Sequence, residues 1–378
     1  MVNRSKIEYL NAIRQRYRRA TKQEKAKILD EFCAVCGHHR KHAVRLLGQN
    51  HPSIRKRSGP KPTYGGDLLI ALKRIWLASE QLCSKRLKAA LPVWIPFYSQ
   101  AHGPLDLKTS ELLVNISPST IDRLLRPVRV RYGRKGLSGT RPGTLLRNQI
   151  PVKTTHWDVT RPGFMEADTV AHCGDSIEGD FVWSLTFTDI YSGWTENRAI
   201  WNKGSSGVIE QVKDVEANLP FTLLGFHSDS GTEFLNHHLW RYFAHRPNPI
   251  DFTRTRPYGR NDNAYVEQKN WTHVRGLLGY QRIEKADLIP IINDLYRSWG
   301  AFHNFFCPNL KLIKKLKVGS KYIKNYDKPK TPYQRLLECP DITTEAKAQL
   351  TATANQLNPF KLKKEIEQKL KRVFNNLR

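Results

Sequence analysis

The sequence predicts a multidomain chain with an all-α N-terminal region, an α/β core built on a mixed five-stranded sheet, and a basic, helical C-terminal region. Its 378 residues are too many for one ordinary hydrophobic core. A hydrophobic content of 39% favours folded domains over disorder. Apolar residues recur at helical spacing in the first part of the chain. After about residue 155 they form alternating or continuous apolar runs, as strands do.

The charge pattern indicates a polyanionic partner, because the chain carries a net charge of +28. That charge is uneven. Between His156 and Asn270, ten basic residues are outnumbered by sixteen acidic ones, so this window carries −6 and the rest of the chain +34. An acidic core between basic flanks suits metal chemistry in the middle and DNA binding at the ends. An RNA-binding protein would also be basic, but it would not need the acidic window.

Residues 1–50 are expected to form a helix-turn-helix domain. Thr21 and Glu24 have the spacing of a capping box, and Gly37 interrupts the helical pattern before a short basic helix. The residues of that helix expected to face DNA are His39, Arg40, Lys41 and Arg45. A plain three-helix bundle with a solvated basic face is the alternative.

The cysteines give no sign of a disulfide framework, since all six are scattered through a long chain. Cys33 and Cys36 precede several histidines, but the gap is too short for a zinc finger, and we favour a buried Cys33 with histidines in a turn. The start of the chain lacks a signal-peptide core, and no apolar run is long enough to span a membrane. We therefore expect a cytoplasmic protein.

A second helical domain is expected over residues 65–135, between a basic Pro/Gly linker at 51–64 and another linker at 136–155. Ser117 followed by Pro118 is a good helix start and predicts a second helix-turn-helix motif. The outward residues of its second helix are Ser119, Thr120 and Arg123.

Residues 156–310 form the expected α/β core. The pattern predicts three strands, a helix, a strand, a helix, a strand and a helix, with a hairpin turn at residues 189–193. This is the order of an RNase H-like mixed sheet with helices on both faces. Residues 311–378 are expected to form a basic helical region that packs on the core or on a second protomer.

Three carboxylates stand out in this core. Asp168 lies on the first predicted strand, Asp229 follows the fourth, and Glu267 lies on the helix after the fifth. A fold that brings them together would suit two hard divalent cations, because Mg²⁺ prefers oxygen ligands. Glu166 would share a strand face with Asp168 and competes for the same role. Glu233 is a candidate supporting residue.

The motifs around these carboxylates resemble the retroviral-integrase-type catalytic core of bacterial insertion-sequence transposases. The stretches that carry the resemblance are 166–169, 188–194, 228–234 and 256–267. It is close over residues 164–310 and weaker toward both ends. The resemblance implies an Asp168, Asp229, Glu267 triad that holds two Mg²⁺ ions, or Mn²⁺ as a substitute, with Asp168 bridging both.

Basic and amide side chains near the triad are candidates for binding DNA. Lys269 and Arg275 lie on the helix of Glu267, although Lys269 points about 200° away from Glu267 in an ideal helix. The loop before that helix contributes Arg256, Arg260, Asn261 and Asn263. An ordinary surface loop would look similar.

The function that these expectations describe is a DNA transposase. It would bind the terminal inverted repeats of its element, cleave DNA to expose 3′ hydroxyls, and join them to double-stranded target DNA as at least a homodimer. One alternative is an RNase H-like, structure-specific nuclease that cuts without joining. The other is a catalytically inactive DNA-binding repressor derived from a transposase.

Overall fold

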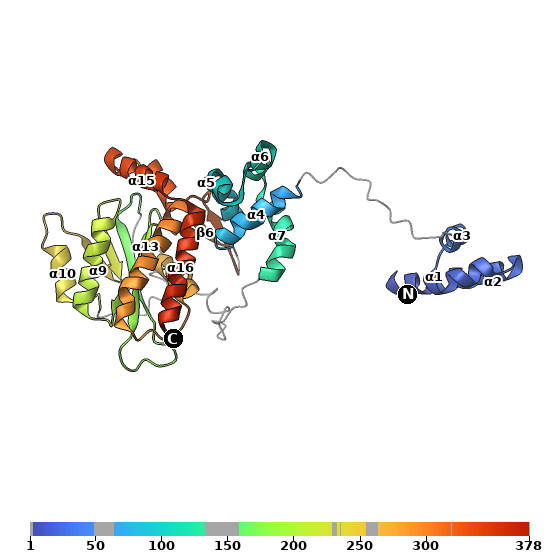
Figure 1. Cartoon of the computed structure of the whole chain (residues 1–378), viewed down its shortest axis with the longest axis horizontal. Coiled ribbons are helices and arrows are strands. Elements are labelled where there is room, and N and C mark those ends of the chain that lie inside the picture. The colour runs from blue at the N-terminus through green and yellow to red at the C-terminus, as the bar shows by residue number, and fades with distance from the viewer. Residues whose placement is uncertain are drawn as a thin grey trace. The chain divides into compact units, whose positions relative to one another are not determined.

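The computed structural model describes residues 3–48, 64–132, 159–228, 233–234, 236–254, 264–318 and 320–377. The chain forms two compact units, Met1–Thr63 and Tyr64–Arg378 (Figure 1). No helix in these described ranges is long and apolar enough to cross a bilayer.

The first unit is a bundle of three helices, as the apolar spacing predicts. Glu24 accepts a hydrogen bond from the backbone N–H of Thr21 at 2.8 Å, so the expected capping pair is present. Gly37 ends the second helix in the left-handed conformation, with φ at 66°. Cys36 is buried in the bundle core, whereas Cys33 is only half-buried, so the expectation of a buried Cys33 is wrong. The helices are α1 (Asn3–Arg19), α2 (Lys22–Cys36) and α3 (Arg40–Gly48).

The second unit begins with four helices. The Ser117 hydroxyl accepts a hydrogen bond from the backbone N–H of Thr120, which starts the last of them where the sequence predicts. Ile121 and Leu125 of that helix are fully buried. The helices are α4 (Asp67–Ala78), α5 (Ser84–His102), α6 (Leu107–Asn115) and α7 (Pro118–Tyr132).

A mixed five-stranded sheet follows, with strand order β3-β2-β1-β4-β5. β1, β2 and β3 are antiparallel neighbours, whereas β4 is parallel to both β1 and β5. This sequence of elements is the one expected for an RNase H-like core. The elements are β1 (Phe164–Ala171), β2 (Val182–Asp189), β3 (Thr195–Trp201), α9 (Ser205–Asn218), β4 (Gly225–Ser228), α10 (His237–Ala244), β5 (Asp251–Arg254) and α11 (Ala264–Lys269).

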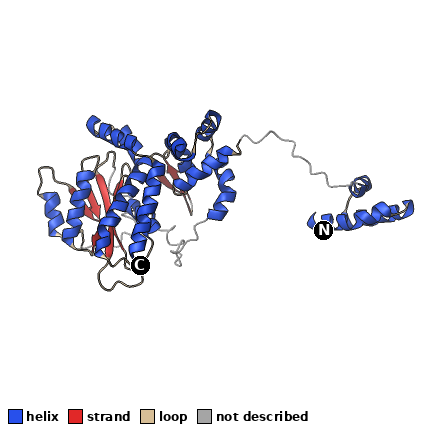
Figure 2. Cartoon of the chain, in the orientation of Figure 1, coloured by secondary structure: helices blue, strands red, loops and turns tan. Residues whose placement is uncertain are grey.

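Helices cover both faces of this sheet, with α9 and α10 on one side and α13 (Ile289–Phe306) and α16 (Pro359–Leu377) on the other (Figures 1 and 2). On the first side, Met165, Ala167 and Phe187 pack against the apolar residues of α9 and α10. Trp240 of α10 is 51% exposed. It lies on the outward face of an amphipathic helix.

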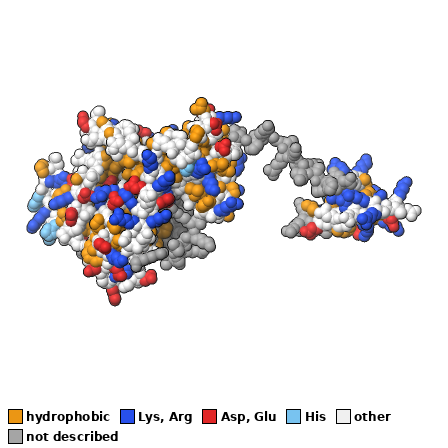
Figure 3. Space-filling model, viewed as in Figure 1, with side chains coloured by type: hydrophobic (Ala, Val, Ile, Leu, Met, Phe, Trp, Pro, Cys, Tyr) orange, Lys and Arg blue, Asp and Glu red, His pale blue; other side chains and the backbone are white. Residues whose placement is uncertain are grey.

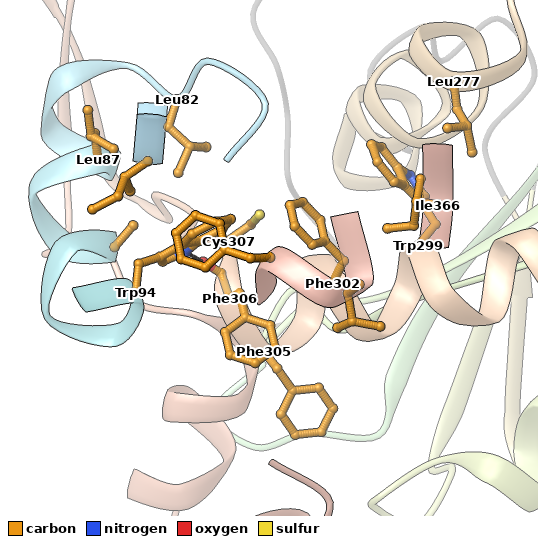
Figure 4. Packing of buried hydrophobic residues seen from close by; sticks show 14 of the residues in the cluster. Leu82, Leu87, Trp94, Leu277, Trp299, Phe302, Phe305, Phe306, Cys307 and Ile366 are labelled. Carbon is orange, nitrogen blue, oxygen red and sulfur yellow. Dashed lines mark hydrogen bonds between the residues drawn. The ribbon is translucent and has the colours of Figure 1, made fainter. Parts of the chain in front are cut away.

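A cluster of buried apolar residues from α5, α13 and α16 joins the helices of residues 64–132 to the α/β core. Trp94 of α5 donates its indole N–H to the Phe306 carbonyl at 2.9 Å, and its ring packs edge-on against Phe302 and Phe360. Figure 4 shows Trp94, Phe302 and Phe306 meeting between the two regions. These helices are therefore held directly against the α/β core.

The C-terminal region is not wholly helical, which corrects the sequence expectation. A two-stranded antiparallel sheet formed by β6 and β7 precedes the helices. The helical expectation overlooked the β-branched Ile313, Val318 and Ile323 on either side of a Gly-Ser pair in the sequence, a pattern that favours a hairpin. The elements here, apart from α16, are β6 (Leu312–Val318), β7 (Lys321–Tyr326), α14 (Pro332–Glu338) and α15 (Thr344–Gln356).

Candidate active site

Asp168 lies on the central strand of the sheet, on the face turned away from α9. Side chains alternate along a strand, so the neighbouring Ala167 is fully buried in the α9 side of the core while Asp168 is half-buried. Ala167 pairs with Ser228 across the parallel β1–β4 ladder. In sequence, Asp168 and Asp229 directly follow these two paired residues. Asp229 itself lies outside the described residues.

Glu166, two residues before Asp168, anchors the helix that carries Glu267. Its carboxylate accepts backbone N–H bonds from Tyr265 and Val266, each at 3.0 Å, at the start of α11. Burial raises the pKa of Glu166 to about 8; the two N–H donors oppose this rise, and the nearby carboxylates of Glu267 and Asp168 add to it. One oxygen of Glu166 therefore holds the first turn of the helix.

Asn270 connects the helix that carries Glu267 to Asp168. The Asn270 amide donates to a carboxylate oxygen of Asp168 at 2.7 Å. Glu267 and Asn270 are three residues apart and so lie on one face, and the Glu267 side chain is exposed. The helix continues as a π-helix (Asn270–Arg275) and a last turn, α12 (Gly276–Leu278). Such π segments occur often at functional sites.

Glu233 supports the strand rather than offering a free carboxylate. One of its oxygens accepts a hydrogen bond from the Thr169 hydroxyl at 2.9 Å and pairs with Lys203 at 3.0 Å. The side chain is 3% exposed. The group thus ties the residue after Asp168 to the segment that follows β4.

The residues expected to bind DNA near the triad have different positions. Lys269 lies on the side of the helix opposite to Glu267. It donates a hydrogen bond to the Gly193 carbonyl at 3.4 Å and lines a partly open cavity. Arg275 stacks its guanidinium 4.7 Å from the centre of the Tyr280 ring. The four loop candidates, Arg256, Arg260, Asn261 and Asn263, lie outside the described residues.

The helix-turn-helix candidates lie on outward faces. Arg40, Lys41 and Arg45 of α3 are exposed, as is His39 directly before the helix, and Lys and Arg side chains are visible in this region of Figure 3. Arg40 forms an ion pair with Asp30. On α7, Ser119 and Arg123 are exposed and Thr120 is half-buried.

The carboxylate oxygens of Asp168 and Glu267, on adjoining elements, fit a hard divalent cation such as Mg²⁺. Within the described residues, no group of three or more His, Cys, Asp and Glu side chains is arranged to hold a metal ion. The metal ligands expected from the sequence include Asp229, which lies outside the described residues.

Sequence reasoning missed two residues of this site. Asn270 is not among the residues predicted from the sequence, although its position three residues after Glu267 places it on the same helical face. Glu166 was considered only as a competing ligand. Its contacts with Tyr265 and Val266 connect segments about a hundred residues apart, and nothing in the local pattern indicates such a pairing.

The chain is similar in sequence to a bacterial protein. The chain is 37% identical over 338 residues to the uncharacterised protein y4rM of Sinorhizobium fredii (strain NBRC 101917 / NGR234), and the match covers 88% of this chain and 95% of that protein. No family model matches the chain. Among solved structures, the catalytic core domain of BIV integrase is similar at 17% identity, with a TM-score of 0.28, over 46% of this chain and 91% of that one. The fold assignment therefore rests on the strand order and pairing of this chain.

Proposed function

The chain belongs to the family of the Sinorhizobium fredii protein y4rM, and we propose that it is a metal-dependent DNA transposase. The observation that carries this proposal is the contact between Asn270 and Asp168, which sets the helix of Glu267 beside the central strand of an RNase H-like sheet. The pairing of Ala167 with Ser228 adds support, because Asp168 and Asp229 are the next residues on each side.

In this proposal Asp168, Asp229 and Glu267 hold two Mg²⁺ ions, with Mn²⁺ as a substitute. When bound, such ions would supply activation of the attacking oxygen and stabilisation of the leaving 3′ oxygen in an in-line phosphoryl transfer. The other residues position these carboxylates. Asn270 donates a hydrogen bond to one oxygen of Asp168. Glu166 holds the first turn of α11, which fixes the position of Glu267.

We assign DNA binding mainly to the basic helical regions. The exposed residues of α3 and of the first turns of α7 would contact the terminal inverted repeats, each region acting as a helix-turn-helix domain. The basic C-terminal region and the loop that contains Arg256 and Arg260 would add backbone contacts. Because two element ends must be joined, we propose that at least two copies of the chain assemble on DNA.

Two other functions predict different products. A nuclease with the same core would cut DNA in the presence of Mg²⁺ but would never join the ends. A repressor derived from a transposase would bind the same DNA and leave it intact.

The test compares the wild-type protein with Asp168→Asn and Asp229→Asn on a labelled duplex that carries candidate element ends, with Mg²⁺. We expect the wild type to nick and join the ends, and each variant to bind the duplex but lose at least about 100-fold in cleavage rate, since losing a ligand should exceed the cost of losing a supporting group. Asp175→Asn, which changes an exposed carboxylate of the same core, is the matched control and should cleave normally. Full cleavage by Asp168→Asn would refute the ligand assignment.

A further inference from the structure

A cavity of about 620 Å³ lies behind the helix that carries Glu267. One face of that helix lines it, with Tyr265, Lys269 and Thr272 at spacings of four and three residues. Glu267 and Asn270 belong to the other face. The volume is within the range of small-molecule and cofactor sites, which is roughly 300–1,000 Å³.

Basic side chains outnumber acidic ones in the lining of the cavity, where Arg86, Lys269 and Lys324 accompany a single carboxylate, Glu80. Arg86 donates to the Pro308 carbonyl at 2.5 Å and Lys269 to the Gly193 carbonyl. Within the described residues neither of these two cations forms an ion pair. Glu80, which also lines the cavity, is paired with Lys363.

Aromatic and histidine side chains line the same cavity. Trp271 is 55% exposed and Tyr326 is 48% exposed, so both present ring surface. The ring nitrogens Nε1 of Trp299 and Nε2 of His273 and His303 are buried and have no hydrogen-bond partner among the described residues.

We propose that this cavity binds one nucleotide, with its base against the aromatic side chains and its phosphate near Arg86 and Lys269. The proposal rests on the proposed function, because the nucleotide would be an unpaired one from a DNA strand that is bound near Glu267. Stacking on aromatic rings tolerates any base, and cations bind the phosphate. A free nucleotide has the same chemistry, so the test must distinguish the two sources.

The experiment uses the full chain without divalent metal, so that cleavage plays no part. The probes are a duplex with a short single-stranded extension containing 2-aminopurine, the corresponding blunt duplex, and the free 2-aminopurine deoxynucleotide 5′-monophosphate. Wild type should bind the extended duplex about 5-fold or more tightly than the blunt one, and should quench the fluorescence of the extension as the base stacks.

Trp271→Ala should lose both effects. Trp240→Ala is the matched control, because Trp240 is similarly exposed, at 51%, but lies on α10, away from the cavity lining, and should retain both. Lys269→Met should weaken binding of the extended duplex and reduce its dependence on salt, since one phosphate contact is lost.

Each outcome decides the proposal. Quenching of the extension that depends on Trp271 supports a strand nucleotide, and quenching of the free nucleotide that depends on Trp271 supports a mononucleotide ligand. If Trp271→Ala behaves like Trp240→Ala with both probes, the proposal is overturned. The proposed function is judged separately by Mg²⁺-dependent cleavage, so either can fail while the other stands.

Discussion

Asn270 donates its side-chain amide to the carboxylate of Asp168 at 2.7 Å, across a sequence separation of 102 residues. This bond joins the central strand of the sheet to the π-helical segment that follows Glu267. Its consequence is geometric, since the orientation of Asp168 depends on a residue of the helix that carries a second candidate metal ligand.

Asn270→Ala is therefore expected to lower Mg²⁺-dependent cleavage by about 10- to 100-fold and to leave DNA affinity unchanged. Groups that orient a metal ligand typically contribute that much to metal affinity or activity. Cleavage rates at several Mg²⁺ concentrations, with binding measured separately, check this. Asn218→Ala, which removes an exposed amide that bonds only within α9, should behave like wild type. Unchanged cleavage by Asn270→Ala would show that Asp168 needs no such support.

Glu166→Ala is expected to lower the free energy of unfolding by about 1–3 kcal/mol, because two backbone N–H groups at the start of α11, one buried and one partly buried, lose their acceptor. Chemical denaturation measures this change. Glu166→Gln keeps one acceptor oxygen and should lose less stability. Glu111→Ala, at an exposed position on α6, is the control and should stay within about 0.5 kcal/mol of wild type. Equal stability of the Ala and Gln variants would argue against the capping role.

Gly193→Ala should destabilise the turn between β2 and β3. Gly193 has φ at +75°, and an added Cβ would lie 2.4 Å from the Asn309 amide nitrogen. The combination of a left-handed backbone and a close contact is expected to cost about 1–3 kcal/mol. The control, Gly207→Ala in α9, meets no atom within 4 Å and should stabilise by up to about 1 kcal/mol. Thermal unfolding of the two variants should shift in opposite directions.

His172 should make the protein sensitive to acid. Burial lowers its pKa to about 3, and its ring hydrogen-bonds to Ser184. As pH falls below about 6.5, the unfolded chain takes up a proton that the folded chain does not bind until about pH 3, so stability decreases through this window.

Because of His172, the free energy of unfolding is expected to fall by about 1.4 kcal/mol for each pH unit below about 6. Unfolding free energies of wild type and His172→Gln between pH 7 and about 5 measure it, and the variant should show the shallower slope. His237→Gln, at an exposed position on α10, should retain the wild-type slope. Parallel slopes for wild type and His172→Gln would contradict the prediction.

Local sequence patterns predicted most elements because burial imposes a period on the chain. The alternation around Asp168 predicted a strand, and Thr21 with Glu24 predicted a helix start that the structure confirms. The prediction was wrong where the same stretch fits both the helical and the strand period. The lysine-rich stretch of β6 and β7 was expected to be helical, yet its β-branched residues form a hairpin.

The sequence by itself determined the order of helices and strands and the candidate carboxylates, because each depends on the spacing of nearby residues. Tertiary structure decided which distant groups touch. It assigned Glu166 to the start of α11 and Asn270 to Asp168, and it placed Lys269 in the lining of a partly open cavity. The physical reason is that such pairings depend on how separate elements pack and on which buried polar groups need partners, and local periodicity contains no information about either.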